Sequence, residues 1–253
     1  MGGRCATHRR GRAWSSARER PVIVYGRNPV REALRGRRRV SRVWIFGDAS
    51  EADWRRPGVD VERVASGEEI ERICASPDHQ GVCADAGDYP YASEEAMLEP
   101  EDALVVCLDQ VQDPHNLGAV CRVAECAGAS GVVVPERRSA QVTPAVCRAS
   151  AGAVEHLDVA RVRNLATFLG NAKRVGAWSY GADAAATVAY DRPDYRGRVV
   201  LVLGSEGRGL RPRVAGACDQ LVALPLRGRV ASLNVSTAAA ALLYGILQRR
   251  GSP

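Results

Sequence analysis

The sequence LGSEGRGL (residues 203–210) ends a short apolar strand pattern, VVLVL (residues 199–203). A second stretch, LPLRGRVASLNVS (residues 224–236), ends another apolar pattern, LVAL (residues 221–224), and precedes a long apolar segment that reaches Leu247. The order is therefore strand, glycine-rich loop, strand, loop, helix. Loops at the carboxyl ends of buried strands are where open α/β sheets bind ligands, so we expect a binding site in these two loops.

The first loop fits neither common phosphate-binding pattern. Gly204, Gly207 and Gly209 do not follow G-x-G-x-x-G, and no Lys-Ser/Thr pair follows them, which excludes a P-loop. Glu206 lies inside the turn and would repel a pyrophosphate. The loop suits a ligand that lacks phosphate or carries positive charge, and an ordinary tight turn is the alternative.

A third segment, DQVQDPHNLGAVCR (residues 109–122), follows the strand pattern LVVCL (residues 104–108). We expect Asn116 to cap a helix that begins at about Leu117. Arg122 then lies between one and two turns into the helix, where a guanidinium suits a phosphate or carboxylate partner. An ion pair of Arg122 with Glu125 or Asp113 on a solvated helix face is the alternative.

Together, the three segments resemble the SpoU (TrmH) family of RNA ribose 2′-O-methyltransferases, within the SPOUT superfamily. The family pattern Asn-x-Gly-x-x-x-Arg occurs as Asn116, Gly118 and Arg122. The Leu-Gly-x-Glu-Gly turn occurs at residues 203–207, and the pattern Ile-Pro-x-x-Gly-x-x-x-Ser-Leu-Asn-Val-Ser occurs at residues 224–236, with Leu in place of the first Ile. The motifs stand in the family's order.

The resemblance implies methyl transfer from S-adenosylmethionine to a ribose 2′-hydroxyl of RNA. The catalytic residues that it implies are Asn116, Arg122, Glu206, Ser232 and Asn234. The cofactor-binding residues that it implies are Leu203, Gly204, Gly209, Leu224, Leu226 and Leu233. Family members have been described with the motif-one Arg as general base, but a guanidinium stays protonated. We therefore expect Arg122 to hold phosphate and stabilise alkoxide charge, and Glu206 to accept the proton or orient the site.

The rest of the chain divides by composition. Composition and patterning predict a basic flexible tail at residues 1–20, a small α/β domain at 21–87, a linker at 88–101 and a larger α/β domain at 102–253. The resemblance implies that the small domain binds RNA and that the larger one is a SPOUT methyltransferase domain. A segment around His79 resembles the substrate-binding domain of the family's ribosomal-RNA branch, and alone this histidine suits a structural loop role. The resemblance also implies a C-terminal trefoil knot, which general topology rules would not predict.

Alternating patterns predict a parallel sheet with helices on both faces in the C-terminal domain. The expected strands are 103–108, 131–134, 153–160, 175–179, 198–203 and 220–224, and the expected helices are 117–127, 143–150, 163–172, 211–217 and 233–248. In the N-terminal domain, we expect strands at 22–25, 40–46, 59–64 and 81–84, a helix at 29–34 with Asn28 as its cap, and a helix at 68–74 with Ser66 as its cap.

A net charge of +6 and a pI of about 9.0 suit an anionic partner, with nucleic acid as the leading candidate. We expect much of the RNA affinity to come from arginines near the first helix, namely Arg27, Arg31, Arg35 and Arg38. The eight cysteines form no C-x-x-C pair, no zinc-ligand spacing occurs, and no apolar run is long enough for a membrane span. We therefore expect a cytoplasmic protein without a metal.

The resemblance also implies a homodimer, for which the apolar residues Leu242, Leu243 and Ile246 could offer surface or could only cover their own sheet. The leading substrate is a guanosine of large-subunit ribosomal RNA. A second hypothesis is that the substrate is transfer RNA. It is disfavoured because the family's transfer-RNA members often lack the N-terminal domain. A non-catalytic ribosome-assembly factor is a third, disfavoured because the polar motif residues are all present. A nucleotide-linked oxidoreductase is a distant fourth, because the phosphate fingerprint is missing.

Overall fold

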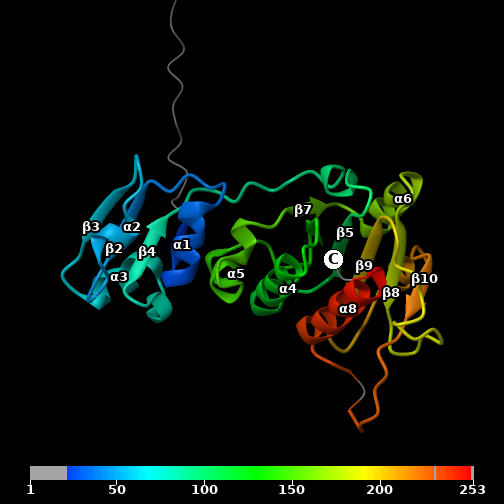
Figure 1. The fold of residues 1–253 in the computed structure, drawn as a ribbon. Coiled ribbons are helices and arrows are strands. Elements are labelled where there is room, and N and C mark those ends of the chain that lie inside the picture. The colour runs from blue at the N-terminus through cyan, green and yellow to red at the C-terminus, as the bar shows by residue number, and fades with distance from the viewer. Residues whose placement is uncertain (1–21, 231, 252–253) are drawn as a thin grey trace, which may run out of the picture.

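Two β-sheets organise the chain, and a computed structural model describes residues 22–230 and 232–251 (Figure 1). The strand orders are β1-β4-β2-β3 in the smaller sheet and β10-β8-β9-β5-β6-β7 in the larger. The predicted basic tail at 1–20 lies outside the described residues. This arrangement confirms the predicted α/β fold, with a small unit that precedes a parallel-sheet domain; the trefoil knot stays a prediction.

The N-terminal unit is a mixed sheet with short helices. Its strands are β1 (Ile23–Tyr25), β2 (Arg42–Ile45), β3 (Asp60–Arg63) and β4 (Val82–Asp85), and its helices are α1 (Arg27–Arg35), α2 (Glu51–Trp54), α3 (Gly67–Cys74) and the 3-10 turn η1 (Pro77–His79). Ser66 caps α3 as predicted, because its side chain accepts a hydrogen bond from the Glu69 amide. The His79 imidazole accepts from the Gly81 amide, which is a structural role.

The larger sheet is parallel throughout. Its strands are β5 (Leu104–Asp109), β6 (Gly131–Pro135), β7 (Val159–Val162), β8 (Trp178–Ala182), β9 (Val199–Gly204) and β10 (Gln220–Val222). Its helices are α4 (Pro114–Cys126), α5 (Pro144–Ala149), α6 (Leu165–Arg174), α7 (Pro212–Ala215) and α8 (Val235–Arg250), with 3-10 turns η2 (Ala96–Leu98) and η3 (Ala153–Glu155). The register pairs Asp109 with Gly204, so the loops that follow β5 and β9 leave the same edge.

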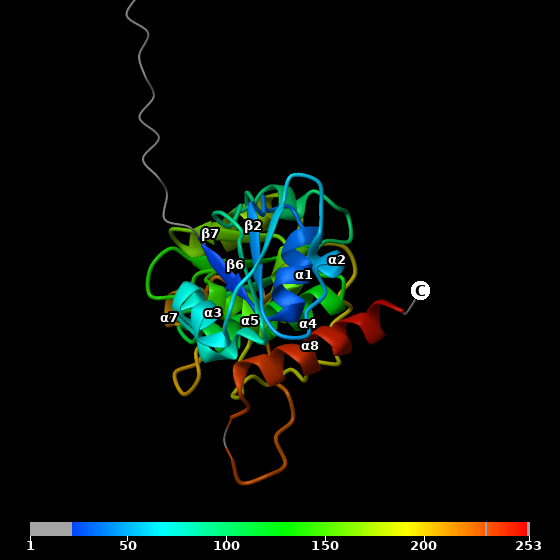
Figure 2. The same cartoon turned by 90° about the vertical axis from the view of Figure 1, so that its left-hand side faces the viewer.

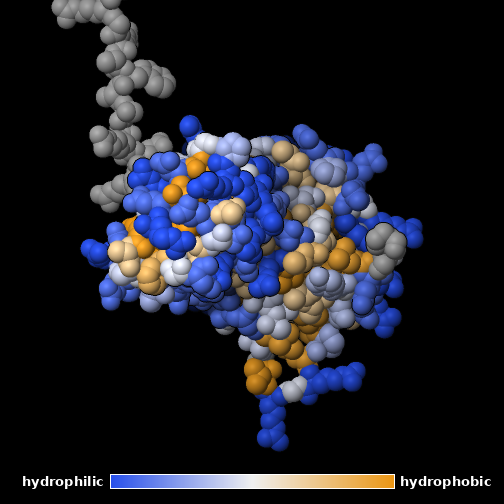
Figure 3. Space-filling model, turned by 60° about the vertical axis from the view of Figure 1, so that its left-hand side comes forward, coloured by the Kyte–Doolittle hydropathy of each residue, from blue (hydrophilic) through white to orange (hydrophobic). Residues whose placement is uncertain are grey.

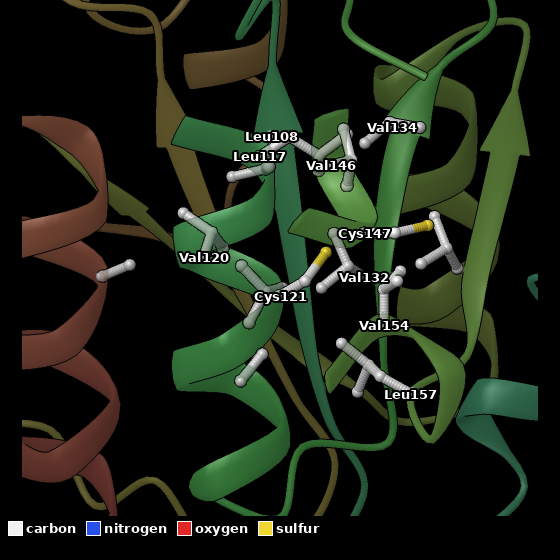
Figure 4. Packing of buried hydrophobic residues seen from close by; sticks show 14 of the residues in the cluster. Leu108, Leu117, Val120, Cys121, Val132, Val134, Val146, Cys147, Val154 and Leu157 are labelled. Atoms are coloured by element: carbon white, nitrogen blue, oxygen red, sulfur yellow. The ribbon is translucent and has the colours of Figure 1, made fainter. Parts of the chain in front are cut away.

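Strand β5 is buried on both faces, as expected for the centre of a parallel sheet. Leu104, Val106 and Leu108 join the apolar cluster under α4, α5 and α8, whereas Val105 and Cys107 join the cluster under α6 and α7. The side chains divide between the two clusters because successive residues of a strand point to opposite faces of the sheet. Figure 4 shows side chains of α4 and α5 meeting those of β6 in the first cluster. Helices therefore cover both faces, as predicted.

Several predicted boundaries were wrong. The predicted strand at 153–160 is instead the turn η3 followed by β7, which begins at Val159. Gly152 causes this break, because its φ of 90° turns the chain out of the strand direction. Strand β8 runs from Trp178 to Ala182 rather than 175–179, and β10 ends at Val222.

Two predicted helix caps were also wrong. Helix α4 begins at Pro114, because Pro fits the first helical position and the Asp113 side chain accepts a hydrogen bond from the His115 amide. Asn116 therefore lies inside the first turn and does not cap it. Helix α1 begins at Arg27 after Gly26, so Asn28 does not cap that helix either.

The two units pack directly on each other. Helix α1 contacts α5 and η3, and β1 also contacts α5 (Figures 1 and 2). One apolar cluster contains Val30 and Ala33 of α1 together with Val146 and Val154 of the larger domain. The units therefore share a core rather than being joined by the linker alone. Within residues 22–230 and 232–251, no helix is long and apolar enough to cross a membrane.

Candidate functional site

A pocket of about 480 Å³ lies at the carboxyl ends of β8, β9 and β10. Its lining includes every residue predicted to bind the cofactor: Leu203, Gly204, Gly209, Leu224, Leu226 and Leu233. Glu206 and Ser232 of the predicted catalytic set also line it. The volume lies in the ordinary range for small-molecule sites, and the lining combines apolar side chains with a few polar groups.

The loop from Gly204 to Gly209 folds back on itself. A Cβ at Gly204 would lie 2.1 Å from the Gly209 carbonyl carbon, so no larger residue fits this backbone. The Gly209 amide donates to the Ser205 carbonyl at 2.9 Å, and Gly209 itself has a φ of 65°. Both glycines were expected from the family resemblance to bind the cofactor. Here Gly204 is required by the loop's own backbone, and Gly209 by its left-handed conformation.

A buried carboxylate anchors the far end of this loop. Asp109, at the end of β5, is fully buried and accepts from the Arg211 backbone amide at 2.8 Å and from the Arg211 Nε at 2.8 Å. This contact ties the segment after Leu210 to the central strand. Sequence reasoning missed the pair, although an acid that directly follows an apolar strand was a signal.

Three polar side chains, one from each motif, meet at the edge of the pocket. The Asn116 Nδ2 donates to Glu206 Oε1 at 2.9 Å, and the Asn234 Nδ2 donates to the same oxygen at 2.6 Å and to Asn116 Oδ1 at 2.9 Å. The second carboxylate oxygen, Oε2, has no hydrogen-bond partner among the described residues. A carboxylate fixed through one oxygen keeps the other for a proton or a hydroxyl.

Asn234 also starts helix α8. Its Oδ1 accepts from the Ser236 amide at 2.8 Å and from the Ser236 hydroxyl at 2.6 Å, so the cap and the Glu206 contact use opposite ends of one side chain. Asn fits this position because it has both a donor and an acceptor. An Asp cap would hold the helix but would place a second carboxylate beside Glu206.

Arg122 stands apart from the polar cluster within this chain. It lies on the exposed face of α4 and does not line the pocket. It forms no ion pair or hydrogen bond with the described residues, so the solvated pairing with Asp113 or Glu125 does not occur. Asp113 instead caps α4. The guanidinium is therefore accessible to an external anion.

Asp183 is a pocket residue that sequence reasoning missed. It follows β8, is half-buried, and its Oδ1 accepts from the Ala185 amide at 2.8 Å. The loop after β10 also contributes exposed apolar side chains at the pocket and beyond it, with Leu226 38%, Leu233 42% and Val230 76% exposed. This loop projects from the molecule in Figures 1 and 3. A ligand or partner that covers it would remove this apolar surface from water.

Among the described residues, no group of three or more His, Cys, Asp or Glu side chains is arranged to hold a metal ion. Seven cysteines are free in that part of the chain. Burial raises the pKa of the Cys121 thiol to about 12, so this thiol is neutral rather than nucleophilic.

Two protein families match the chain. The SpoU rRNA Methylase family matches residues 103–244, and the family described as RNA 2'-O ribose methyltransferase substrate binding matches residues 23–92. A relative from Bacillus subtilis (strain 168), named Putative TrmH family tRNA/rRNA methyltransferase YacO, is 36% identical over 239 residues. That match covers 90% of this chain and 95% of the relative.

Solved structures show the same fold. The SpoU methyltransferase AviRb from Streptomyces viridochromogenes, in complex with the cofactor AdoMet, is 26% identical with a TM-score of 0.76, covering 91% of this chain and 90% of that one. An AdoMet-bound rRNA methyltransferase from Sinorhizobium meliloti is 26% identical with a TM-score of 0.79, covering 92% and 89%. Both matches include most of the chain rather than the larger domain alone.

Proposed function

The chain belongs to the SpoU methyltransferase family, and from that premise we propose that it transfers a methyl group from S-adenosylmethionine to a ribose 2′-hydroxyl of RNA. The observation that carries the proposal is the meeting of Asn116, Glu206 and Asn234 at the rim of an apolar pocket. The leading substrate is a guanosine of large-subunit ribosomal RNA, and a transfer-RNA nucleotide is the second candidate.

The pocket fits S-adenosylmethionine in size and chemistry. Leu203, Leu224 and Leu233 provide apolar surface for the adenine, and the turn at Gly204 exposes backbone groups for hydrogen bonds. Asp183 and Glu206 add negative charge, which suits a cationic ligand without phosphate. When bound, S-adenosylmethionine supplies an electrophilic methyl group on its sulfonium.

The chain's own residues would prepare the acceptor. Asn116 and Asn234 hold Glu206 through Oε1, which leaves Oε2 to take the proton of the ribose hydroxyl. Ser232, at the pocket, would orient the target nucleotide. Arg122 would hold a neighbouring phosphate and stabilise developing alkoxide charge, because its exposed guanidinium presents several N–H donors to an anion.

We propose a division of labour between the domains, with RNA recognition at 21–87, a linker at 88–101 and methyl transfer at 102–253. The match of a substrate-binding family to residues 23–92 supports it. Hydrophilic residues cover much of the N-terminal unit on the face that Figure 3 shows. Arg227 and Arg229, exposed in the loop after β10, would add phosphate contacts near the pocket. Free thiols suit a reducing compartment, and we place the reaction in the cytoplasm.

We also propose a homodimer, although not through the residues first considered. Leu242, Leu243 and Ile246 are buried under their own sheet, so they cannot form a dimer surface. The exposed stripe of α8 contains Thr237, Ala241 and Tyr244, and Tyr244 is 49% exposed. Light scattering at micromolar concentration should give twice the mass of 27.1 kDa, and Tyr244→Glu should reduce it to one chain. A wild-type monomer would contradict the dimer.

The methyl transfer itself is tested by mapping ribose methylation in total RNA from cells with and without this gene. One missing 2′-O-methyl mark in large-subunit ribosomal RNA would support the leading substrate, and a missing mark in transfer RNA would support the second. Unchanged maps, together with no S-adenosylmethionine binding by calorimetry, would favour a non-catalytic RNA-binding factor.

A further inference from the structure

A buried ion pair joins the N-terminal unit to the larger domain. Arg38, which follows α1, has a side chain that is 1% exposed, and Glu155, at the end of η3, has one that is 0% exposed. The guanidinium Nε and Nη2 donate to both carboxylate oxygens at 2.8 to 3.2 Å. Because this contact is bidentate, it restricts the angle between the groups as well as their distance.

Arg38 makes two further contacts at the junction between the N-terminal unit and the larger domain. Nη1 donates to the Gly87 carbonyl at 3.1 Å, and Nη2 contacts the Cys147 Sγ of α5 at 3.0 Å. Burial raises the pKa of the Cys147 thiol to about 12, so the thiol is neutral, and Glu155 supplies the negative charge that balances the buried guanidinium. Arg38 is thus unable to contact RNA phosphate, contrary to the expectation from its place in the basic cluster.

The backbones around this pair are in close contact. A Cβ at Gly36 would lie 2.9 Å from the Glu155 Cβ, and a Cβ at Gly152 would lie 2.6 Å from the Glu32 Cβ. A second, more exposed ion pair, Arg37 with Asp158, crosses the same junction at 2.5 Å. The two units are therefore tightly packed where the buried pair lies.

We propose that Arg38 and Glu155 are positioning residues that select which ribose of a bound RNA reaches the pocket. They touch neither cofactor nor RNA. They hold the N-terminal unit at one distance and angle from the polar cluster of Asn116, Glu206 and Asn234. An RNA gripped by the N-terminal unit then presents one nucleotide to that cluster. The inference rests on the proposed methylation of RNA.

Removal of one partner should open the junction. Glu155→Gln leaves the buried Arg38 guanidinium without a counter-charge. A buried charge without its partner is strongly destabilising. Because the pocket is formed by the larger domain alone, cofactor binding should survive while the RNA is presented at variable angles. Replacing both partners by apolar residues, as in Arg38→Met/Glu155→Leu, should restore a closed junction, since well-packed apolar pairs substitute for buried ion pairs.

The experiment uses the full chain and four proteins: wild type, Glu155→Gln, the Arg38→Met/Glu155→Leu double variant, and Asp158→Asn as a matched control that breaks only the exposed pair. Hydrogen exchange is read in peptides that cover 28–40 and 150–158, and in β5 as an internal reference. S-adenosylmethionine affinity is measured by calorimetry. Methylated positions are mapped on the isolated target RNA, with kcat and KM at the main position.

In Glu155→Gln, we expect exchange on the order of a hundredfold faster at the junction, unchanged exchange in β5, and unchanged cofactor affinity. We also expect methylation to spread to neighbouring riboses, with a higher KM for RNA. The double variant and Asp158→Asn should match wild type in all readouts. A loosened junction with wild-type site selection would overturn the proposal, as would spread methylation in a double variant whose junction is closed.

The measurements distinguish methyl transfer by the protein from the positioning role of Arg38 and Glu155. If the wild-type protein methylates no RNA, the function is wrong, while the exchange measurements still test the junction without any substrate. If Glu155→Gln exchanges like wild type, the positioning role is wrong even though methyl transfer stands. Loss of cofactor affinity in Glu155→Gln would mean a general loss of structure and would also overturn the specific role.

Discussion

Glu206 is the residue on which the proposed proton transfer depends. Its Oε1 accepts from Asn116 and Asn234, so Glu206→Gln keeps an oxygen that can accept both hydrogen bonds while it removes the charge. We expect melting temperature and S-adenosylmethionine affinity to change little, and methyl transfer in a single turnover to fall about 100- to 10,000-fold. A variant with the wild-type rate would show that Glu206 only holds the loop.

Gly204 is the residue that tests whether cofactor binding depends on the backbone of the loop from Gly204 to Gly209. In Gly204→Ala, the new Cβ would lie 2.1 Å from the Gly209 backbone, so the loop must rearrange at a cost of roughly 1–3 kcal/mol. We expect calorimetry to show that cofactor binding is abolished or greatly weakened. Gly170→Ala on α6 is the control, because nothing lies within 4 Å of its Cβ. Equal cofactor affinity in both variants would contradict the assigned role of the turn.

Among the secondary-structure elements, α8 has an N-terminal cap, Asn234, that is also part of the polar cluster. Asn234→Ala removes both the cap on Ser236 and the contact with Glu206. We expect the free energy of unfolding to fall by about 1 kcal/mol because the cap is absent. Methyl transfer should also fall, because Glu206 loses one of its two anchors.

Ser66→Ala is the matched control, since it removes a side-chain cap from α3 in the N-terminal unit without touching the pocket. It should cost a similar free energy of unfolding and leave methyl transfer on saturating RNA unchanged. If both variants lose activity equally, the effect of Asn234→Ala is one of stability and not of the polar cluster.

For the whole molecule, the shared core changes what domain deletion can show. Removing residues 1–98 would expose the α5 and η3 surface and leave Glu155 without Arg38, so the larger domain should lose stability as well as RNA affinity. A strict two-domain division of labour would predict that this deletion spares cofactor binding. Because the two units share a core, surface variants that keep the junction intact are the better test.

Arg31→Gln/Arg35→Gln provides such a variant on α1. For each arginine that binds a phosphate, its removal should reduce the slope of log affinity against log salt by roughly 0.7 to 0.9, while cofactor affinity is unchanged. Binding isotherms over a salt series measure this slope. Arg174→Gln on α6, whose Nη2 bonds Asn171, is the control on the other side of the molecule. Equal slopes in all three proteins would remove α1 from the RNA interface.

Features that depend on local patterns could be predicted from the amino-acid sequence. Alternating apolar segments predicted a parallel sheet with helices on both faces, and the two loops that follow the apolar patterns at 199–203 and 221–224 were predicted to line the pocket. Ser66 was recognised as a cap because capping acts over three residues. These features could be predicted because their interactions are short in sequence or repeat with a fixed period.

Contacts between groups that are distant in sequence became known from the packed structure. Pro114 and Asp113 start α4 earlier than Asn116 suggested, and this places the Asn116 amide on Glu206, 90 residues away. Arg38 looked like one more cationic residue in a basic cluster, but it pairs with Glu155 across 117 residues and is buried. A local pattern carries no information about such partners. Burial and pairing are decided when separate elements pack, and there the desolvation of a charge must be balanced by whichever group the fold brings beside it.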